Sequence, residues 1–434
     1  MQKIGLDRNK KAALLMLIAA CVLTITVIRA AITEITYDEA YTYMAYAEEI
    51  RFNDFDTFRY IYNEAVANNH WLNTIAIAAI GRILGVTYCE FAIRLPNLIA
   101  FAVYCAYVCV SYRKRMISFI CAAFLLLNYY LNEFYGLARG YAMAQTCVYA
   151  AAFYYLCWKE SAYQKHRCLA GCALGLMVGT WANTVVFLLF PAFGILWIWR
   201  LISEKQFWLF LKKWAWFVIL FILSSLFLLR YHFKISASDM PLYTGEGSFY
   251  DSVVRSYLGM LTSAPKLIPL LLAALCVISA AAVFILKKVV FQCDLTLGLG
   301  IFIVTNILMN AVLHKGYITE RVAIPFYGYI VLSLFQLWNT AWDRLDEKWL
   351  EGEKKRLLHK TVTVLIVCAL GFHNLHMLSF TSTTDWAHNY GRRDRILAGY
   401  IRTGEYQELE DHEENRMNDR FYRVKYWYIL NSDL

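Results

Sequence analysis

Residues 12–32 read AALLMLIAACVLTITVIRAAI, and this stretch decides the class of protein. It is apolar over the length of roughly 20 residues that a helix needs to cross a bilayer. Lys3, Arg8, Lys10 and Lys11 precede it. Because basic residues flank membrane helices on the cytoplasmic side, we expect a cytoplasmic N-terminus. The run is longer than a signal-peptide core and ends in no clear cleavage site, so we interpret it as a retained anchor.

The whole chain has the composition of a membrane protein. Hydrophobic residues make up 59% of the 434 residues and charged residues only 17%, against roughly 25% charged in soluble domains. This composition excludes a soluble globule, a disordered chain and a collagen-like chain. The net charge of +9 fits cytoplasmic loops rather than nucleic-acid binding. The 12 cysteines have no zinc-like spacing, so we interpret them as small buried hydrophobes.

Applied along the chain, the same criteria predict an all-α integral membrane protein with about eleven transmembrane helices. When the spans alternate in direction, the basic segments at 113–115, 159–167, 200–213 and 287–288 all fall on the cytoplasmic side. The predicted spans are residues 12–32, 91–112, 116–131, 141–158, 168–182, 185–199, 214–229, 267–286, 295–313, 322–338 and 361–378.

The segments outside these spans complete the predicted organisation. Residues 33–90 form a first outer loop with interfacial helices. Within it, residues 71–86 form an apolar helix that stays at the outer face, because residues 91–112 must run inward to reach Arg113. Residues 379–434 form a small extracytoplasmic C-terminal segment, and alternation over 422–430 predicts a strand there. The transmembrane domain is therefore residues 1–378.

The first outer loop carries an acidic and aromatic cluster, ITYDEAYTY at residues 35–43. Two interpretations fit it equally well. In the first, Thr36 or Asp38 caps a helix that begins near Glu39. In the second, a carboxylate at the outer membrane surface serves as a general base.

Two further clusters lie at the outer ends of predicted spans. Residues 68–73 combine three asparagines with His70, which is more hydrogen-bonding capacity than a helix start requires. A solvated interfacial histidine is the simpler alternative. Residues 132–141 contain Arg139, which either snorkels to the interface or grips a phosphate group.

A last cluster, HKGYITER at residues 314–321, places positive charge outside, against the positive-inside trend. An anionic lipid headgroup as ligand would explain this charge. The alternative is that Arg321 only pairs with Glu320 or Glu133.

Together these motifs resemble the GT-C-type membrane glycosyltransferases. The nearest subgroup is the superfamily of protein O-mannosyltransferases and aminoarabinose transferases, which use polyprenyl-phosphate sugars in bacteria. YDEAY at 37–41 is similar to the Asp-Glu signature of the first outer loop. NHWL at 69–72 resembles His-Pro-Pro-Leu with both prolines replaced, and FAIRLPN at 91–97 resembles an Arg-Leu-Pro-Ser segment. YGLARGY at 135–141 is similar to Tyr-x-x-x-Arg-x-Tyr, and ERVAIP at 320–325 is similar to Arg-Tyr-x-x-x-Pro.

The resemblance covers about residues 1–330 and implies a GT-C-like fold and a glycosyltransferase activity. The donor would be a polyprenyl-phosphate-linked sugar, and the acceptor a hydroxyl group of a lipid, glycan or protein. Asp38 would be the general base of one inverting displacement, and Arg139 and Arg321 would stabilise the leaving phosphate. Such enzymes generally need no metal, and the outer loops hold no separate Asp-x-Asp. We therefore expect no metal and no other cofactor.

The candidate site combines two predicted catalytic residues with a set of predicted substrate-binding residues, in a bacterial plasma membrane with the C-terminus outside. The predicted catalytic residues are Asp38 and Glu39, and the predicted substrate-binding residues are Tyr37, Tyr41, Asn69, His70, Glu133, Tyr135, Arg139, Tyr141, His314, Lys315, Glu320 and Arg321.

Two other classes of protein stay open. A transporter or flippase for lipids or polysaccharides needs ionisable residues within its spans and paired interrupted helices. Here Arg29 and Arg82 are the clear charged residues within apolar segments, whereas the acidic residues cluster outside. A non-catalytic assembly or export subunit would be insensitive to the loss of Asp38. The position of the acidic residues favours the transferase.

Overall fold

In the part of the chain that it describes, the computed structural model is all-helical, with 86% of residues in helices and no strands. The described residues are 2–33, 36–54, 56–57, 59, 69–85, 89–236, 248–255, 293–313, 316–318, 320–349 and 353–377. The predicted span at 267–286, the predicted strand at 422–430 and the whole segment 379–434 lie outside them.

The elements in chain order are α1 (Gln2–Ile32), α2 (Tyr37–Thr42), η1 (Tyr43–Ala47), α4 (Trp71–Leu84), α5 (Glu90–Arg113), α6 (Phe119–Leu126), α7 (Tyr129–Tyr135), α8 (Gly140–Glu160), α9 (Arg167–Ala182), η2 (Thr184–Leu189), α10 (Phe190–Ser203), α11 (Phe207–Ser236), η3 (Tyr250–Arg255), α14 (Asp294–Leu313), η5 (Glu320–Phe326), α15 (Tyr327–Trp349) and α16 (Glu353–Met377). The elements η1 and η3 are π-helical, and η2 and η5 are 3-10 helices.

Six helical segments are long and apolar enough to cross a membrane by length and composition, which is typical of a multi-pass membrane protein. They are Arg8–Ile32, Glu90–Arg113, Thr184–Ser203, Phe207–Ile235, Asp294–Val312 and Arg321–Thr340. Each coincides with a predicted span. Four further predicted spans correspond to helices that are shorter or more polar, namely α6 with α7, α8, α9 and α16. The count of about eleven spans therefore stays a prediction.

The predicted single helix over residues 116–131 is divided into α6 and α7, and Asn128 sits at the break. The side-chain oxygen of Asn128 accepts a hydrogen bond from the N–H of Leu131 at 2.9 Å and so caps α7. A helix end leaves its last four carbonyl groups without intrahelical partners. In α6 all of them are satisfied. The carbonyl of Ala123 accepts from the N–H of Leu127, and that of Leu126 accepts from the amide of Asn132.

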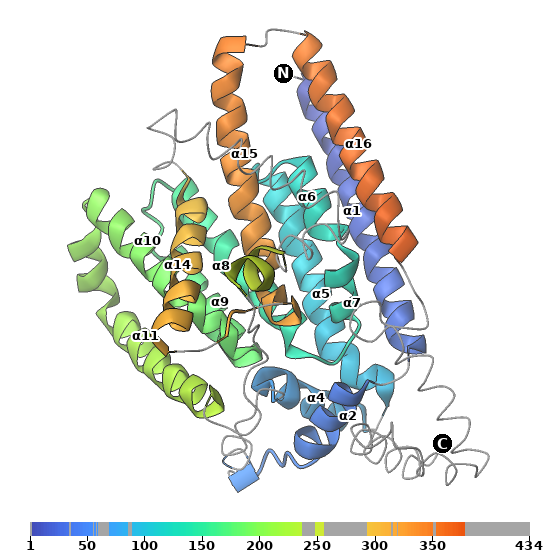
Figure 1. The fold of residues 1–434 in the computed structure, drawn as a ribbon, viewed down its shortest axis with the longest axis vertical. Helices are drawn as coiled ribbons and strands as arrows, with labels where there is room; N and C mark the ends of the chain where they lie inside the picture. Colours follow the sequence, from blue (N-terminus) through green and yellow to red (C-terminus); the bar gives the residue numbers. More distant parts are fainter. Residues whose placement is uncertain are drawn as a thin grey trace.

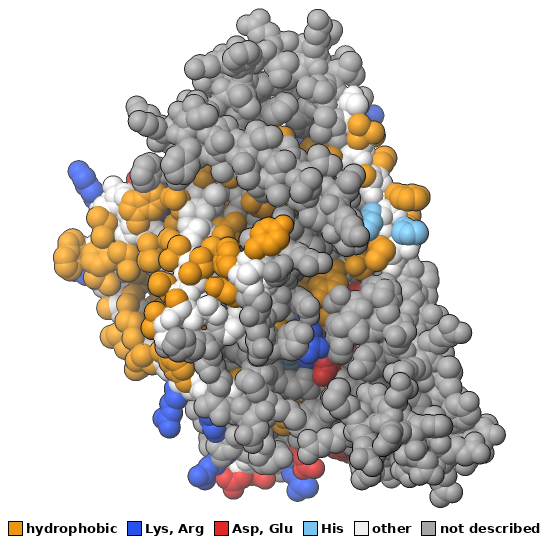
Figure 2. Space-filling view, viewed as in Figure 1, with side chains coloured by type: hydrophobic (Ala, Val, Ile, Leu, Met, Phe, Trp, Pro, Cys, Tyr) orange, Lys and Arg blue, Asp and Glu red, His pale blue; other side chains and the backbone are white. Residues whose placement is uncertain are grey.

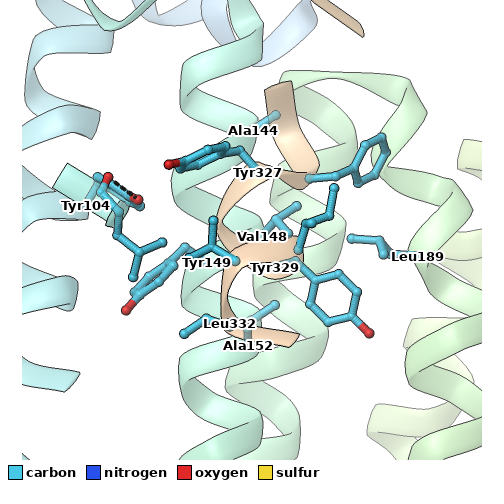
Figure 3. Packing of buried hydrophobic residues seen from close by; sticks show 14 of the residues in the cluster. Tyr104, Ala144, Val148, Tyr149, Ala152, Leu189, Tyr327, Tyr329 and Leu332 are labelled. Atoms are coloured by element: carbon cyan, nitrogen blue, oxygen red, sulfur yellow. Dashed lines mark hydrogen bonds between the residues drawn. The ribbon is translucent and has the colours of Figure 1, made fainter. Parts of the chain in front are cut away.

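The other two carbonyls of that turn accept from tyrosines of the core. Tyr327 Oη donates to Phe124 O at 2.6 Å, and Tyr104 Oη donates to Leu125 O at 2.9 Å. Figure 3 shows Tyr104, Tyr149, Tyr327 and Tyr329 among apolar side chains of α8 and α15. A buried tyrosine needs a partner for its hydroxyl, and a broken helix needs donors for its end. The hydroxyl groups of Tyr104 and Tyr327 therefore gain acceptors inside the core, and the end of α6 gains donors.

The surface over α10, α11 and α14 has the character of a lipid-facing surface. Figure 2 shows hydrophobic side chains covering this area, with Lys and Arg side chains near its two ends. On α11, Trp216 is 59% exposed and Leu223 is 57% exposed. A soluble protein rarely exposes so continuous an apolar surface, so these helices fit a bilayer environment.

The charged groups of the described residues gather at two opposite ends of the bundle. At one end, Arg8 donates to the carbonyl of Tyr112 at 2.6 Å, which brings the start of α1 to the end of α5. At the other end lie α2 and α4, where α1 ends and α5 begins (Figure 1). Segments that the sequence places on one side of the membrane thus lie together. Which end faces the cytoplasm stays a prediction.

Candidate functional site

Asp38 lies between two arginines that come from distant parts of the chain. Its Oδ2 atom is 3.2 Å from Nη2 of Arg139 and 3.2 Å from Nη1 of Arg321. The Asp38 side chain is only 12% exposed, and that of Arg139 only 4%. These are the three residues to which the sequence assigns the base and the phosphate grip, and the structure brings them together. The described ion pair of Arg321 is with Asp38, whereas Glu133 pairs with Arg29; the side chain of Glu320 is not described.

Glu39 is held differently from its neighbour. Its carboxylate makes a two-fold contact with Arg94, with Arg94 Nε to Oε1 at 2.8 Å and Arg94 Nη2 to Oε2 at 2.9 Å. The backbone N–H groups of Ala138 and Thr36 donate to the same carboxylate at 2.6 and 2.9 Å. Both oxygens are engaged and both side chains of the ion pair are fully buried. The contacts therefore favour a positioning role for Glu39 over the catalytic role expected from the sequence.

The charge on Glu39 is stabilised by these partners. Burial by itself raises the pKa of Glu39, but the charge and hydrogen bonds of Arg94, followed by the N–H groups of Ala138 and Thr36, outweigh it. They hold the pKa below its ordinary value. The bond from Thr36 N–H to Glu39 is half of a capping box. The helix begins at Tyr37, two residues before the expected start, so Asp38 lies inside it and not at its cap, and its carboxylate faces the arginines.

Arg94 is the residue of this site that the sequence prediction missed as a functional position. Besides Glu39, it donates to the carbonyls of Ala30 at 2.8 Å and Thr33 at 2.5 Å, at the end of α1. It thereby ties α1, α2 and α5 together beneath Asp38. Arg94 lies in the 91–97 segment that resembles the family motif. The sequence alone does not show which carboxylate pairs with an arginine inside an apolar helix.

Arg139 is placed by the start of α8 and by a close backbone contact. It is the N-cap residue of α8, and its guanidinium lies 5.4 Å from the ring centre of Tyr141. A Cβ atom on Gly140 would collide with the carbonyl oxygen of Ala182 and with His70. Only glycine allows α8 to begin so near the end of α9. The start of α8 also adds partial positive charge beside Arg139.

His70 is the N-cap residue of α4 and lies against the same part of the site. Its ring centre is 4.8 Å from that of Tyr141, and the residue is 5% exposed. Burial first, and then the charges of Arg139 and Arg321, lower the pKa of His70 well below its ordinary value. His70 is therefore neutral at physiological pH. Asn69 accepts a hydrogen bond from Thr74 at 3.2 Å, a contact within the first turn of α4.

Two predicted substrate-binding residues have their described contacts elsewhere. Glu133 forms an ion pair with Arg29 at 3.5 Å, between α7 and α1. Tyr135 is fully buried, shares a hydrogen bond with Thr146 at 2.8 Å and stacks on Phe101. These contacts hold helices together, because a charge or hydroxyl inside a bundle requires a partner. We expected both residues at the ligand, and the packing gives Tyr135 a core position instead.

The remaining predicted residues lie partly or wholly outside the described part of the chain. His314 and Lys315 are outside it altogether. Tyr37, Tyr41 and Glu320 belong to α2 and η5, but their side chains are not described. Among the described residues, no group of three or more His, Cys, Asp or Glu side chains could hold a metal ion.

Comparisons with known proteins add no relative to these observations. No protein-family model matches the chain, and no curated protein and no solved structure matches it.

Proposed function

We propose that this protein is a multi-pass membrane glycosyltransferase with a GT-C-like fold and about eleven spans. It would transfer a sugar from a polyprenyl-phosphate donor to an acceptor hydroxyl on the extracytoplasmic side. Its membrane would be a bacterial plasma membrane, with the N-terminus cytoplasmic. The motifs at 37–41, 135–141 and 320–325 suggest this activity.

One observation carries the proposal, namely the pairing of Asp38 with both Arg139 and Arg321. The three residues are far apart in the sequence, and Arg321 is separated from Asp38 by 283 positions. The motifs that contain them all resemble parts of one reaction site. Two guanidinium groups beside one carboxylate, at the start of α8, form an arrangement suited to a phosphate group.

The chemistry that fits this geometry is a single displacement at the anomeric carbon. A bond forms between the acceptor oxygen and that carbon, while the bond from the carbon to the phosphate oxygen breaks. The electron pair of the broken bond leaves on the phosphate, where Arg139 and Arg321 stabilise the negative charge. The proton of the acceptor hydroxyl passes to the carboxylate of Asp38. The configuration of the sugar is inverted.

Phosphate binding would also change the state of Asp38. In the described structure its carboxylate is paired with the two arginines. A phosphate competes for the same guanidinium groups, since both anions offer paired oxygens. Arginines that turn to the phosphate release Asp38 to face the acceptor. The donor itself would thus prepare the base.

The positions of the buried charges argue against the transporter alternative. A transport pathway needs ionisable groups within the membrane-spanning region. Among the described residues, the ion pairs Arg94–Glu39 and Arg29–Glu133 are buried and Arg200–Asp294 is partly buried, and each lies near one end of the helices that carry it.

The test is a transfer assay with Asp38→Asn. Purified protein in nanodiscs is incubated with radiolabelled polyprenyl-phosphate sugars, and sugar release or transfer is measured. We expect Asp38→Asn to lower turnover by at least about 100-fold, the scale of general-base catalysis. Donor binding should be retained or become tighter, because the loss of the Asp38 charge leaves both arginines available to the phosphate. The matched control is Asp54→Asn, because Asp54 is an exposed aspartate of the same outer loop.

Near-wild-type turnover by Asp38→Asn would exclude Asp38 as the base. No turnover by the wild-type protein with any donor, together with donor-dependent flipping in proteoliposomes, would favour the flippase.

A further inference from the structure

The turn that leads into Arg139 is held on both sides of one residue, Ala138. The backbone turns sharply there, because the N–H of Arg139 donates to the carbonyl of Leu137 at 2.8 Å. Glu39 Oε1 accepts from the N–H of Ala138 at 2.6 Å, and Asn73 Nδ2 donates to the carbonyl of Ala138 at 3.0 Å. Both backbone polar groups of the residue before Arg139 are therefore fixed by side chains of other helices.

The orientation of the Asn73 amide is determined by its two partners. A backbone carbonyl can only accept, so the NH₂ group of Asn73 faces Ala138 and its oxygen is free to accept elsewhere. That oxygen accepts from Nδ2 of Asn97 at 2.7 Å. Both asparagines are fully buried, where an amide without partners would be costly. Asn97 thus acts on the turn through Asn73.

One face of α5 supports both contacts with Ala138. Arg94 and Asn97 are three positions apart on α5, a spacing that places two side chains on the same face of a helix. Arg94 holds Glu39, whereas Asn97 holds Asn73. Figure 1 shows α2 and α4, which carry Glu39 and Asn73, at the same end of α5. Two chains of hydrogen bonds from α5 therefore converge on the N–H and the carbonyl of Ala138.

Stability alone does not account for Asn97. Its Oδ1 atom is buried and has no hydrogen-bond partner among the residues that the structure describes. A buried acceptor without a partner lowers stability. The chain therefore keeps an amide at position 97 at a cost, and the described side-chain bond of this amide is the one that leads through Asn73 to Ala138.

We propose that Asn73 and Asn97 are positioning residues that hold Arg139 in place to bind the phosphate of the donor. The proposal rests on the proposed function. The Asn73 bond fixes the peptide that joins Ala138 to Arg139, so it sets the direction in which the Arg139 side chain leaves the backbone. The guanidinium lies 3.2 Å from the carboxylate of Asp38, and a rotation of that peptide would carry it away. Guanidinium groups bind phosphate through directed hydrogen bonds, so their placement decides affinity.

The experiment measures the binding of citronellyl phosphate to the full-length protein in nanodiscs, without any transfer step. Asn73→Ala removes the donor to Ala138, and we expect about tenfold weaker binding, the scale of one net hydrogen bond. Asn97→Ala leaves Asn73 in contact with the carbonyl of Ala138, so the loss should be smaller, about threefold. The double variant should bind no more weakly than Asn73→Ala alone, because Asn97 acts through Asn73.

Arg139→Ala separates a positioning role from a general loss of stability. In that background Asn73→Ala should cause no further loss of citronellyl phosphate binding, because the residue that it positions is gone. The matched control is Asn132→Ala. Asn132 is also buried, its amide donates to the carbonyl of Leu126 at 3.0 Å, and its Oδ1 atom likewise has no partner within the described part of the chain. This variant should lose stability and keep the wild-type affinity.

Hydrogen exchange supplies a readout that needs no ligand. The N–H groups of Ala138 and Arg139 should exchange faster in Asn73→Ala than in the wild type, because the turn opens more easily, and at the wild-type rate in Asn132→Ala. Unchanged exchange of these two groups in Asn73→Ala would overturn the proposal.

Three binding results would also overturn it. They are wild-type affinity in Asn73→Ala, an equal loss of affinity from Asn73→Ala with and without Arg139, and an equal loss from Asn132→Ala. The proposed function fails separately, through absence of sugar transfer by the wild-type protein, and that outcome leaves the binding and exchange measurements unaffected.

Discussion

Asp38 and Glu39 are neighbours in the chain, yet their carboxylates meet different surroundings. Successive residues of a helix point about 100° apart, so one faces the packed bundle and the other the site. Glu39 is fully buried against Arg94, whereas Asp38 is 12% exposed between Arg139 and Arg321. The pair therefore combines a fixed structural charge with a charge that a ligand can reach.

Glu39→Gln should destabilise the protein, because it leaves the buried Arg94 without a counter-charge. Removing one partner of a buried ion pair costs about 3–5 kcal/mol. The measurement is the free energy of unfolding in detergent. Glu49→Gln serves as the control, since Glu49 is an exposed residue nearby, and it should change the value little. Equal stability of the two variants would contradict the positioning role of Glu39.

The pH dependence of stability gives a second check on Glu39. Its pKa in the folded protein lies below the ordinary value of 4.5. The unfolded state therefore takes up the proton first as the pH falls. The stabilisation is fully present above about 4.5 and is lost as the pH falls through the lower, folded value. The difference between wild type and Glu39→Gln should shrink over that acidic range.

At the scale of elements, the site is assembled from the beginnings of four helices. Asp38 is the second residue of α2 and Arg321 the second residue of η5, while His70 and Arg139 are the N-cap residues of α4 and α8. The start of a helix carries partial positive charge and unpaired N–H groups. Their convergence favours an anionic ligand over a cationic one.

Gly140→Ala should disturb this convergence. The added methyl group meets the carbonyl of Ala182 and the side chain of His70, so the start of α8 must shift and carry Arg139 with it. We expect a loss of about 1–3 kcal/mol of stability and reduced transfer. Gly194→Ala is the matched control, because a Cβ at Gly194 meets nothing within 4 Å. That change should leave stability unchanged or raise it by about 0.5–1 kcal/mol. Full activity of Gly140→Ala would contradict the argument.

At the scale of the whole molecule, the end opposite the site is held by a second buried charge cluster. Asp294, fully buried at the start of α14, pairs with Arg200 of α10. It also accepts from Tyr163 Oη at 2.9 Å and from Tyr155 Oη at 3.1 Å. One carboxylate thus joins α8, α10 and α14 and the loop after α8, at a distance from the chemistry.

Asp294→Asn should therefore separate stability from activity. The loss of the ion pair leaves Arg200 uncompensated, and we expect unfolding to become easier by about 3–5 kcal/mol. Transfer per folded molecule should stay close to wild type, because the site lies at the other end. Glu204→Gln, a change at an exposed neighbour, is the control. A selective loss of turnover with unchanged stability would show that this cluster is part of the site.

The orientation of the molecule can be tested with a natural cysteine. Cys89 is exposed at the start of α5, at the end that carries Asp38. A membrane-impermeant maleimide should label Cys89 on intact cells, and Cys89→Ser is the control for that signal. A cysteine introduced as Lys114→Cys, at the other end of α5, should be labelled only after permeabilisation. The opposite pattern would reverse the predicted topology.

Much of this protein could be predicted from local sequence, and the reason is physical. Membrane helices need long apolar runs, and the basic residues that flank them indicate the cytoplasmic side of the membrane. Residues 12–32 and the other five membrane-length helices were therefore predictable. Sorting polar residues by side also placed Asp38, Arg139 and Arg321 in one region. The sequence did not predict the break between α6 and α7. The carbonyl groups left free at the end of α6 accept hydrogen bonds from Tyr104 and Tyr327, which come from other parts of the chain.

Only the tertiary structure shows which charged residues from distant parts of the chain form ion pairs. Arg94 is 55 residues from Glu39, and nothing local distinguishes it from an arginine that snorkels to the interface. Glu133 was expected at the ligand and pairs with Arg29 instead. The residues around His70 likewise come together from α4, α9, η2 and α11. The sequence determined which residues must avoid lipid, whereas packing decided which of them meet, because pairing energies depend on distances that chain order does not encode.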